Sequence, residues 1–246
     1  DNGQLVLPMA FVPAAERYNL MQGIDRKIVS MAFEAHGNRY RYVDIDLTPS
    51  LSLNLSGATM GDETFAQFVR EQFSRHQIPP QIICFEVTET AAIANLSGAA
   101  MLIKELREIG CRFSLDDFGS GLSSFAYLKG LPVDYLKIDG AFVKNMASDP
   151  IDCAMVQAIN DIGHVMGIET IAECVENQFT LDMLKRMGID HAQGFGVERP
   201  RLFEVFESDI KDWSQASEPD AISAARPRES IAFFAPTPPF PGLVKH

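Results

Sequence analysis

Two adjacent acidic residues, Asp116 and Asp117, follow a short apolar run in the segment Leu115-Asp116-Asp117-Phe118-Gly119. Adjacent carboxylates at a strand end point to different sides of the chain, and without a cation their repulsion would make one of them take up a proton. Two divalent ions about 3.5–4 Å apart remove this conflict, because one Asp can bridge both ions while the other binds one. An Asp is also a good helix N-cap, so the pair alone leaves both interpretations open.

Other predicted strand ends carry ligands of the same kind. Asn54, Glu86 and Glu173 each close a short apolar run, and such hard oxygen ligands suit Mg²⁺ or Mn²⁺. A single strand-end carboxylate is usually a cap or an ion-pair partner, but several carboxylates on one face would repel one another without a metal. We therefore predict a divalent-metal site formed by these strand-end residues: Asn54, Glu86, Asp116, Asp117 and Glu173.

Lys137 lies in an apolar strand context, Tyr135-Leu136-Lys137-Ile138-Asp139. A buried ammonium group needs a partner, so we expect Lys137 to contact a phosphate or orient a nucleophile. An ion pair with Asp116 or Asp139 is the plainer interpretation, and the two are compatible.

Glu89, Gln193 and the histidines are the remaining polar candidates for a functional site. Glu89, three residues after Glu86, is predicted to hold the loop that follows Asp117. Gln193, at the last predicted strand end, is either a ligand contact or an ordinary loop amide. The histidines do not form a ligand cluster, which argues against a histidine metal site and a Ser-His-Asp triad.

The elements that must position these residues alternate between strands and helices. Apolar runs predict strands, and helical spacing predicts helices. The strands are expected at 51–55, 81–87, 112–116, 134–139, 168–172 and 191–194, and the helices at 14–35, 62–76, 91–109, 123–129, 150–166 and 178–187. Residues 39–47 also alternate like a strand with one solvated face.

This alternation predicts an α/β fold built from βαβ units with a mainly parallel sheet. In a β/α barrel the carboxyl ends of all strands open on one face, where the chemistry gathers. A doubly wound sheet is the alternative, although no glycine-rich phosphate loop follows the first strand. Six β/α units are predicted, so the expected fold is a TIM-like (β/α) barrel that is incomplete at its N-terminus, with about six of eight units.

Composition limits the class of protein. A formal net charge of -12 argues against sequence-independent nucleic-acid binding. The four cysteines form no CxxC pair, and no apolar run is long enough to span a bilayer. Residues 1–206 are expected to form the domain, and residues 207–246 a linker or tail that is disordered or loosely docked. For the segment from Ser230 to Ala235, docking as an edge strand is an alternative to disorder.

From Asn2 to about Pro200 the chain resembles the EAL domains, bacterial phosphodiesterases that hydrolyse cyclic di-GMP to pGpG. The order and spacing of the matching segments are specific. These segments are Phe11–Glu16, Leu53–Gly57, Phe85–Glu89, Leu115–Gly121, Leu131–Asp139, Ala172–Glu176 and Gln193–Phe195.

The resemblance implies a β/α barrel with two Mg²⁺ or Mn²⁺ ions held by Asn54, Glu86, Asp116, Asp117 and Glu173. It implies that Lys137 positions the attacking water and that Glu173 also serves as a base. It further implies substrate contacts at Gln193 and Glu176, and anchoring of the loop after Asp117 by Glu89 and Ser120. The implied setting is a cytoplasmic homodimer, linked in its parent protein to upstream sensory or GGDEF-type domains, with the parent itself free to be membrane-tethered.

One departure from the family pattern is that the sequence contains no Glu-Ala-Leu segment. In the family, the Glu of that early strand is a metal ligand, and an Arg after it helps to hold the phosphate. We expect the chain to begin just after this strand and its turnover, taken alone, to be impaired. The competing hypotheses are a degenerate cyclic di-GMP sensor or protein-interaction module, and another metal-dependent barrel phosphohydrolase.

Overall fold

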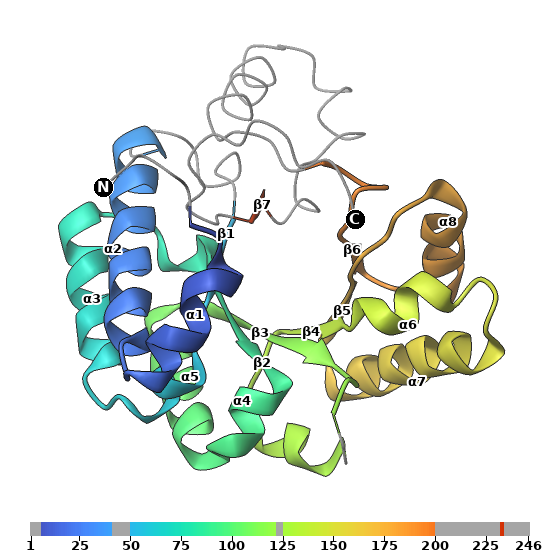
Figure 1. Cartoon of the computed structure of the whole chain (residues 1–246), viewed down its shortest axis with the longest axis horizontal. Helices are drawn as coiled ribbons and strands as arrows, with labels where there is room; N and C mark the ends of the chain where they lie inside the picture. Colours follow the sequence, from blue (N-terminus) through green and yellow to red (C-terminus); the bar gives the residue numbers. More distant parts are fainter. Residues whose placement is uncertain (1–5, 41–49, 122–124, 200–231, 234–246) are drawn as a thin grey trace.

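The structure, a computed structural model, describes residues 6–40, 50–121, 125–199 and 232–233. Six parallel strands lie side by side in their order along the chain and form the inner wall of an open arc (Figure 1). This arrangement confirms the predicted α/β fold with six strands of a barrel. The strands are β1 (Leu51–Asn54), β2 (Ile83–Thr88), β3 (Arg112–Phe118), β4 (Tyr135–Ile138), β5 (Glu169–Ala172) and β6 (His191–Ala192).

Helices cover the outer side of this arc (Figure 1). From α3 onward they lie between successive parallel strands, as βαβ units require. The α-helices are α1 (Pro8–Arg17), α2 (Met21–Tyr40), α3 (Phe65–His76), α4 (Glu89–Ala94), α5 (Leu96–Ile109), α6 (Gly140–Asn145), α7 (Pro150–Met166) and α8 (Gln178–Met187). Short 3-10 turns are η2 (Gly57–Gly61), η3 (Pro80–Ile82) and η4 (Phe125–Gly130).

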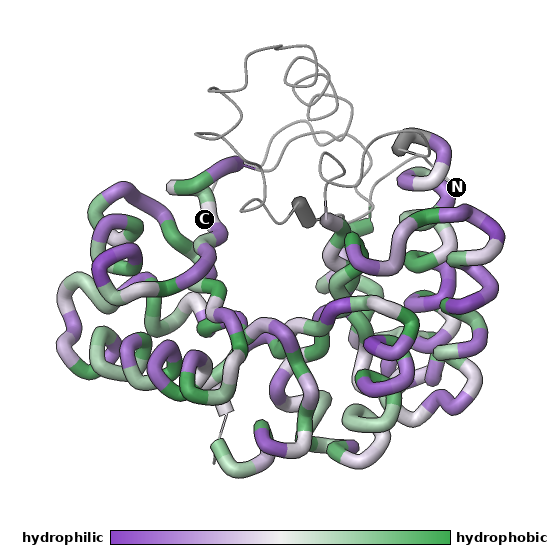
Figure 2. Tube along the Cα trace, turned by 180° about the vertical axis from the view of Figure 1, so that it is seen from behind, coloured by the Kyte–Doolittle hydropathy of each residue, from purple (hydrophilic) through white to green (hydrophobic). Residues whose placement is uncertain are grey.

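Alternate residues of each strand face opposite ways, and the two faces differ in chemistry. Leu53, Phe85 and Leu115 are among the strand residues buried in the main core cluster. Asn54 and Glu86 are partners in register, so their side chains share the other face, which lines the inside of the arc. Figure 2 shows hydrophilic and hydrophobic residues alternating along the outer helices, as expected for helices with one face on a core. The strands therefore present apolar groups to the helices, and polar groups together with a small buried cluster of Cys84, Tyr135 and Ile171 to the inside.

The first predicted helix, 14–35, is wrong in extent. The structure has two helices, α1 and α2, separated at Asn19, whose φ of 56° is left-handed and ends the helical path. Helix α2 runs on to Tyr40, so the strand predicted at 39–47 is wrong at its first two residues. Residues 41–49 lie outside the described part of the chain.

Elsewhere the boundaries shift for local reasons. The helix predicted at 91–109 is two helices, because the Asn95 side chain accepts a hydrogen bond from the Gly98 N–H and starts α5 anew. Helices α7 and α8 match the prediction, since left-handed Gly167 and Gly188 end them. Helix α6 was not predicted, and Asp139 caps it.

A short strand, β7 (Ala232–Phe233), pairs in parallel with the outer edge of β1. It lies within the tail segment for which docking as an edge strand is the alternative to disorder, and the rest of that tail from residue 200 is outside the described residues. Strand β7 places a neighbour beside β1, which would otherwise leave its backbone groups unpaired on that side.

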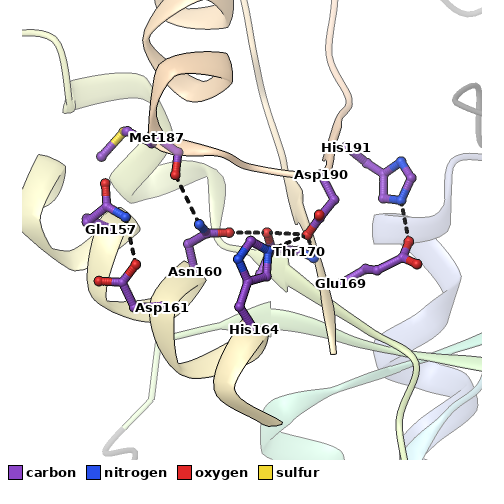
Figure 3. A network of polar contacts seen from close by, with 9 residues as sticks. All are labelled: Gln157, Asn160, Asp161, His164, Glu169, Thr170, Met187, Asp190 and His191. Atoms are coloured by element: carbon purple, nitrogen blue, oxygen red, sulfur yellow. Dashed lines mark hydrogen bonds and ion pairs between the residues drawn. The ribbon is translucent and has the colours of Figure 1, made fainter. Parts of the chain in front are cut away.

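A polar network ties α7 to the amino ends of β5 and β6 (Figure 3). Asn160, 1% exposed, accepts a 2.5 Å hydrogen bond from the Thr170 hydroxyl and donates to the Met187 carbonyl oxygen at 3.1 Å. Asp190 accepts from the Thr170 N–H at 2.8 Å and pairs with His164 at 2.8 Å. These groups lie at the end of the strands opposite Glu173, where β/α barrels build stability rather than chemistry.

Candidate metal centre

Lys137 lies buried among three carboxylates, two from β2 and β3 and one from the residue directly after β5. Its Nζ is 3.0 Å from Glu86 Oε2, 3.0 Å from Asp116 Oδ1 and 2.6 Å from Glu173 Oε1. Lys137 and Glu86 are 2% and 1% exposed. Because the strands are parallel and neighbouring, side chains at their carboxyl ends converge on this single ammonium group. The predicted ion pair with Asp116 is present, whereas Asp139 caps α6 instead.

Asp116 and Asp117 do not point to different sides of the chain, and that expectation is wrong. The pairing of β3 with β4 shifts register between Leu115 and Phe118, and Asp117 takes a left-handed φ of 54°. Such a bulge turns the second side chain toward the first. As a result, Asp116, Asp117 and Glu173 each offer an oxygen, all within 4.8 Å of one another. Neither Asp caps a helix among those described.

The pKa values of the acidic groups reflect this crowding. Burial, opposed by Lys137 and reinforced by Asp116, raises the pKa of Glu173 to about 7. Burial likewise raises the pKa of Glu86, and burial together with Asp116 and Asp139 raises that of Asp117. Burial works against a charge on Lys137, but its three carboxylate partners outweigh this effect and raise its pKa. Three carboxylates thus share the Lys137 ammonium group, and a fourth, Asp117, lies beside two of them.

The residues present fit divalent ions. Glu86 Oε1 is buried and has no hydrogen-bond partner among the described residues, so the lone pairs of this oxygen are available to a metal ion. Asn54 lies opposite Glu86 in register at the exposed carboxyl end of β1. Carboxylate and amide oxygens are the donors that Mg²⁺ and Mn²⁺ prefer, and no described His or Cys belongs to this oxygen cluster.

The loop after Asp117 is fastened to α4. Glu89, 1% exposed and the first residue of α4, accepts a 3.0 Å hydrogen bond from the Gly119 N–H and another from the Tyr127 hydroxyl. The Ser120 hydroxyl donates to the Asp117 carbonyl oxygen at 2.8 Å. Gly119 has a φ of 96°, and a Cβ there would lie 2.8 Å from the Phe142 ring. This position therefore requires glycine.

Gln193 and Glu176 follow β6 and β5, at the carboxyl ends of these strands. Gln193 Oε1 is buried without a hydrogen-bond partner among the described residues. Glu176 is exposed, with Lys144 Nζ 4.0 Å away. Gly194, with a φ of 150°, packs directly on the Val175 backbone, where a Cβ would come within 2.3 Å. The Gln193-Gly194 sequence thus brings the loop after β6 against the loop after β5.

Two contributors were not predicted from the sequence. Tyr127 reaches Glu89 from η4, and Asp25 on α2 holds the turn after β1. Each partner is more than 30 residues away along the chain, so no local spacing signals the contact.

A known protein family matches most of this chain. The family model described as the EAL domain matches residues 1–200. The chain belongs to the EAL domain family. Among curated relatives, this EAL domain is 44% identical over 200 residues to the cyclic di-GMP phosphodiesterase PdeB of Shewanella oneidensis, covering 81% of this chain and 23% of that protein. The chain spans about a quarter of the length of the curated relatives it matches.

Solved structures agree in fold. The PaMucR phosphodiesterase in complex with c-di-GMP is similar with a TM-score of 0.75 and 31% identity, over 83% of this EAL domain and 82% of that chain. The FimX EAL domain of Pseudomonas aeruginosa bound to c-di-GMP gives a TM-score of 0.73 and 25% identity, over 80% of this chain and 78% of that chain.

Within the described residues of this EAL domain, no helix is both long and apolar enough to cross a membrane.

Proposed function

We propose that this domain hydrolyses cyclic di-GMP to linear pGpG, using two divalent ions held by Asn54, Glu86, Asp116, Asp117 and Glu173. The observation that carries the proposal is the convergence of three carboxylates on Lys137, with Asp117 beside two of them, at the carboxyl ends of parallel strands. Phosphodiesterase relatives and c-di-GMP complexes in the same family support the choice of substrate.

Hydrolysis forms a bond between a water oxygen and phosphorus and breaks the bond from phosphorus to the ribose 3′ oxygen, which leaves protonated. Bound Mg²⁺ or Mn²⁺ would neutralise the phosphate and acidify the water. Glu173, whose pKa is raised to about 7 by burial, is suited to accept the proton of the water at its carboxylate near neutral pH. Lys137 holds Glu86, Asp116 and Glu173 in place and positions the water.

The remaining site residues bind substrate or shape the loop. Gln193, with its buried free amide oxygen, and Glu176, at the exposed rim, would contact the nucleotide. Glu89 and Ser120 would keep the loop of Asp117 in its strained conformation. The parent protein would join this domain to sensory or GGDEF-type domains in a cytoplasmic homodimer.

Incubation with cyclic di-GMP and Mn²⁺, followed by chromatography for pGpG, tests the proposal. Asp116→Asn and Glu173→Gln should each lower turnover by at least 100-fold, because each removes a charged ligand oxygen. Glu169→Gln is the matched control, since Glu169 lies at the opposite end of β5 from Glu173 and should leave turnover unchanged. Turnover by Asp116→Asn equal to that of the unmodified chain would refute the assignment.

The same assay addresses the sensor hypothesis. A sensor would bind cyclic di-GMP at this site without turnover. Saturable binding of cyclic di-GMP with no pGpG at any Mn²⁺ concentration would establish a sensor. Production of pGpG that is abolished by EDTA would establish the hydrolase.

A further inference from the structure

Helix α2 grips the turn that follows β1. Asp25 is 2% exposed, and its Oδ2 accepts three hydrogen bonds from this turn: from the Ser56 N–H at 2.9 Å, the Ser56 hydroxyl at 2.6 Å and the Thr59 hydroxyl at 2.6 Å. One helical turn earlier, Gln22 Nε2 donates to the Ala58 carbonyl oxygen at 3.0 Å. Two side chains on one face of α2 therefore hold residues 56–59.

This turn begins immediately beyond the proposed ligand Asn54. The Leu55 N–H donates to the Glu86 carbonyl oxygen at 2.8 Å, which fixes the backbone on the β2 side. The bonds to Asp25 fix it on the α2 side, starting at the next residue, Ser56. The backbone directly after Asn54 is thus held at two consecutive residues, Leu55 and Ser56.

The chemistry of Asp25 argues for a specific role. A carboxylate buried in a helix–turn interface is costly unless its hydrogen bonds are made, and an apolar residue would satisfy packing more simply. Charge-assisted bonds from two hydroxyls and one amide are short and directional. They hold the turn in one conformation, whereas apolar packing alone tolerates small shifts.

We infer that Asp25 is a positioning residue for the metal centre, acting through the Ser56–Thr59 turn on Asn54. The inference rests on the proposed function only in taking Asn54 as a metal ligand. Asp25 is not one of the proposed metal ligands, and its hydrogen bonds go to Ser56 and Thr59.

Titration of Mn²⁺ into the full chain, followed by electron paramagnetic resonance of free Mn²⁺, tests the inference without any turnover. Asp25→Ala should raise the Mn²⁺ dissociation constant roughly tenfold, the effect usual for residues that orient metal ligands. Asp25→Asn should raise it less, because an amide oxygen still accepts these bonds but without charge. Hydrogen exchange at residues 55–59 should accelerate in the same order.

Asp62 provides the matched control. Asp62 also joins α2 to a turn, because it accepts hydrogen bonds from Arg26 at 2.7 Å and from the Thr64 N–H and hydroxyl at 3.0 and 2.6 Å. This turn lies directly before α3, whereas the turn held by Asp25 lies directly after Asn54 and Leu55. Asp62→Ala should lower the melting temperature and leave the Mn²⁺ dissociation constant unchanged. If Asp25→Ala does not fold, Ser56→Ala and Thr59→Ala remove two of the donors and should weaken Mn²⁺ binding in its place.

Asn54→Ala separates the role of Asp25 from the assignment of Asn54 as a metal ligand. It should weaken Mn²⁺ binding, and the double variant with Asp25→Ala should bind no more weakly than Asn54→Ala alone. Normal Mn²⁺ affinity in folded Asp25→Ala, with weakened binding in Asn54→Ala, overturns the inference and leaves the proposed function intact. Normal affinity in Asn54→Ala overturns both the inference and the assignment of Asn54. Hydrolysis itself is still judged by Asp116→Asn.

Discussion

At the scale of single residues, the raised pKa of Glu173 should make the free energy of unfolding depend on pH. Burial raises its pKa from the ordinary 4.5 to about 7, so between these values the folded chain binds more protons than the unfolded chain. The unfolding free energy should therefore fall, by about 1–3 kcal/mol, as pH rises from 4.5 to 7 in EDTA. Urea unfolding at several pH values measures this slope, which should flatten in Glu173→Gln. An equal slope in both proteins would contradict the prediction.

Sequence reasoning at this scale succeeded where a residue's role follows from its place at a strand end. The sequence predicted that Glu86, Asp116 and Glu173 would lie together because parallel strands bring their carboxyl ends together, and it gave Asp116 as a partner for Lys137. The structure places all three within 3.0 Å of Lys137 Nζ, and the contacts of Glu86 and Glu173 with Lys137 were not predicted. The relative direction of Asp116 and Asp117 was mistaken, because strand alternation holds only for regular pairing and the bulge breaks it.

At the scale of elements, the bond between η4 and α4 should control the loop after Asp117. Tyr127→Phe removes one of the donors to the buried Glu89 carboxylate. The free energy of unfolding should fall by about 1–3 kcal/mol, and the Mn²⁺ affinity should fall several-fold because Gly119 depends on the same carboxylate.

Tyr135→Phe is the control for this prediction. The Tyr135 hydroxyl is bonded to Arg112 at the amino end of the sheet, so this variant should lose stability without losing Mn²⁺ affinity. Equal Mn²⁺ affinities in Tyr127→Phe and the unmodified chain would show that the loop holds its shape without Tyr127. Urea unfolding and Mn²⁺ titration supply both readings.

Helix and strand types were predictable from periodicity, but several junctions were not. The helices at 14–35 and 91–109 were expected to be continuous, yet Asn19 and Asn95 divide them by left-handed geometry and by capping. Asn tolerates either role, and apolar spacing continues across both breaks. Periodicity therefore reports which face is buried, whereas the side chains at the junction decide where one helix ends.

At the scale of the whole molecule, the β1 edge links the tail to the proposed site. Strand β7 pairs with Leu51 and Ser52, the first half of the strand that ends in Asn54. The sequence offered this docking as an alternative for one apolar segment in a proline-rich tail. It did not indicate β1 as the partner strand, because the edge on which a strand docks depends on the completed sheet. A ladder of two residue pairs contributes little, on the order of 1 kcal/mol, so we expect it to open readily.

Ala232→Pro tests that coupling, because proline removes a backbone donor from β7. Amide exchange in β1 should accelerate roughly fivefold, matching the loss of about 1 kcal/mol of local stability, and exchange in β4 should not change. Ala224→Pro, in the tail but outside β7, is the control and should leave β1 exchange as it was. A peptide spanning residues 229–235, added to Ala232→Pro, should restore slow exchange by pairing with the vacated edge. If β1 exchanges alike in all three proteins, the edge is protected by something other than β7.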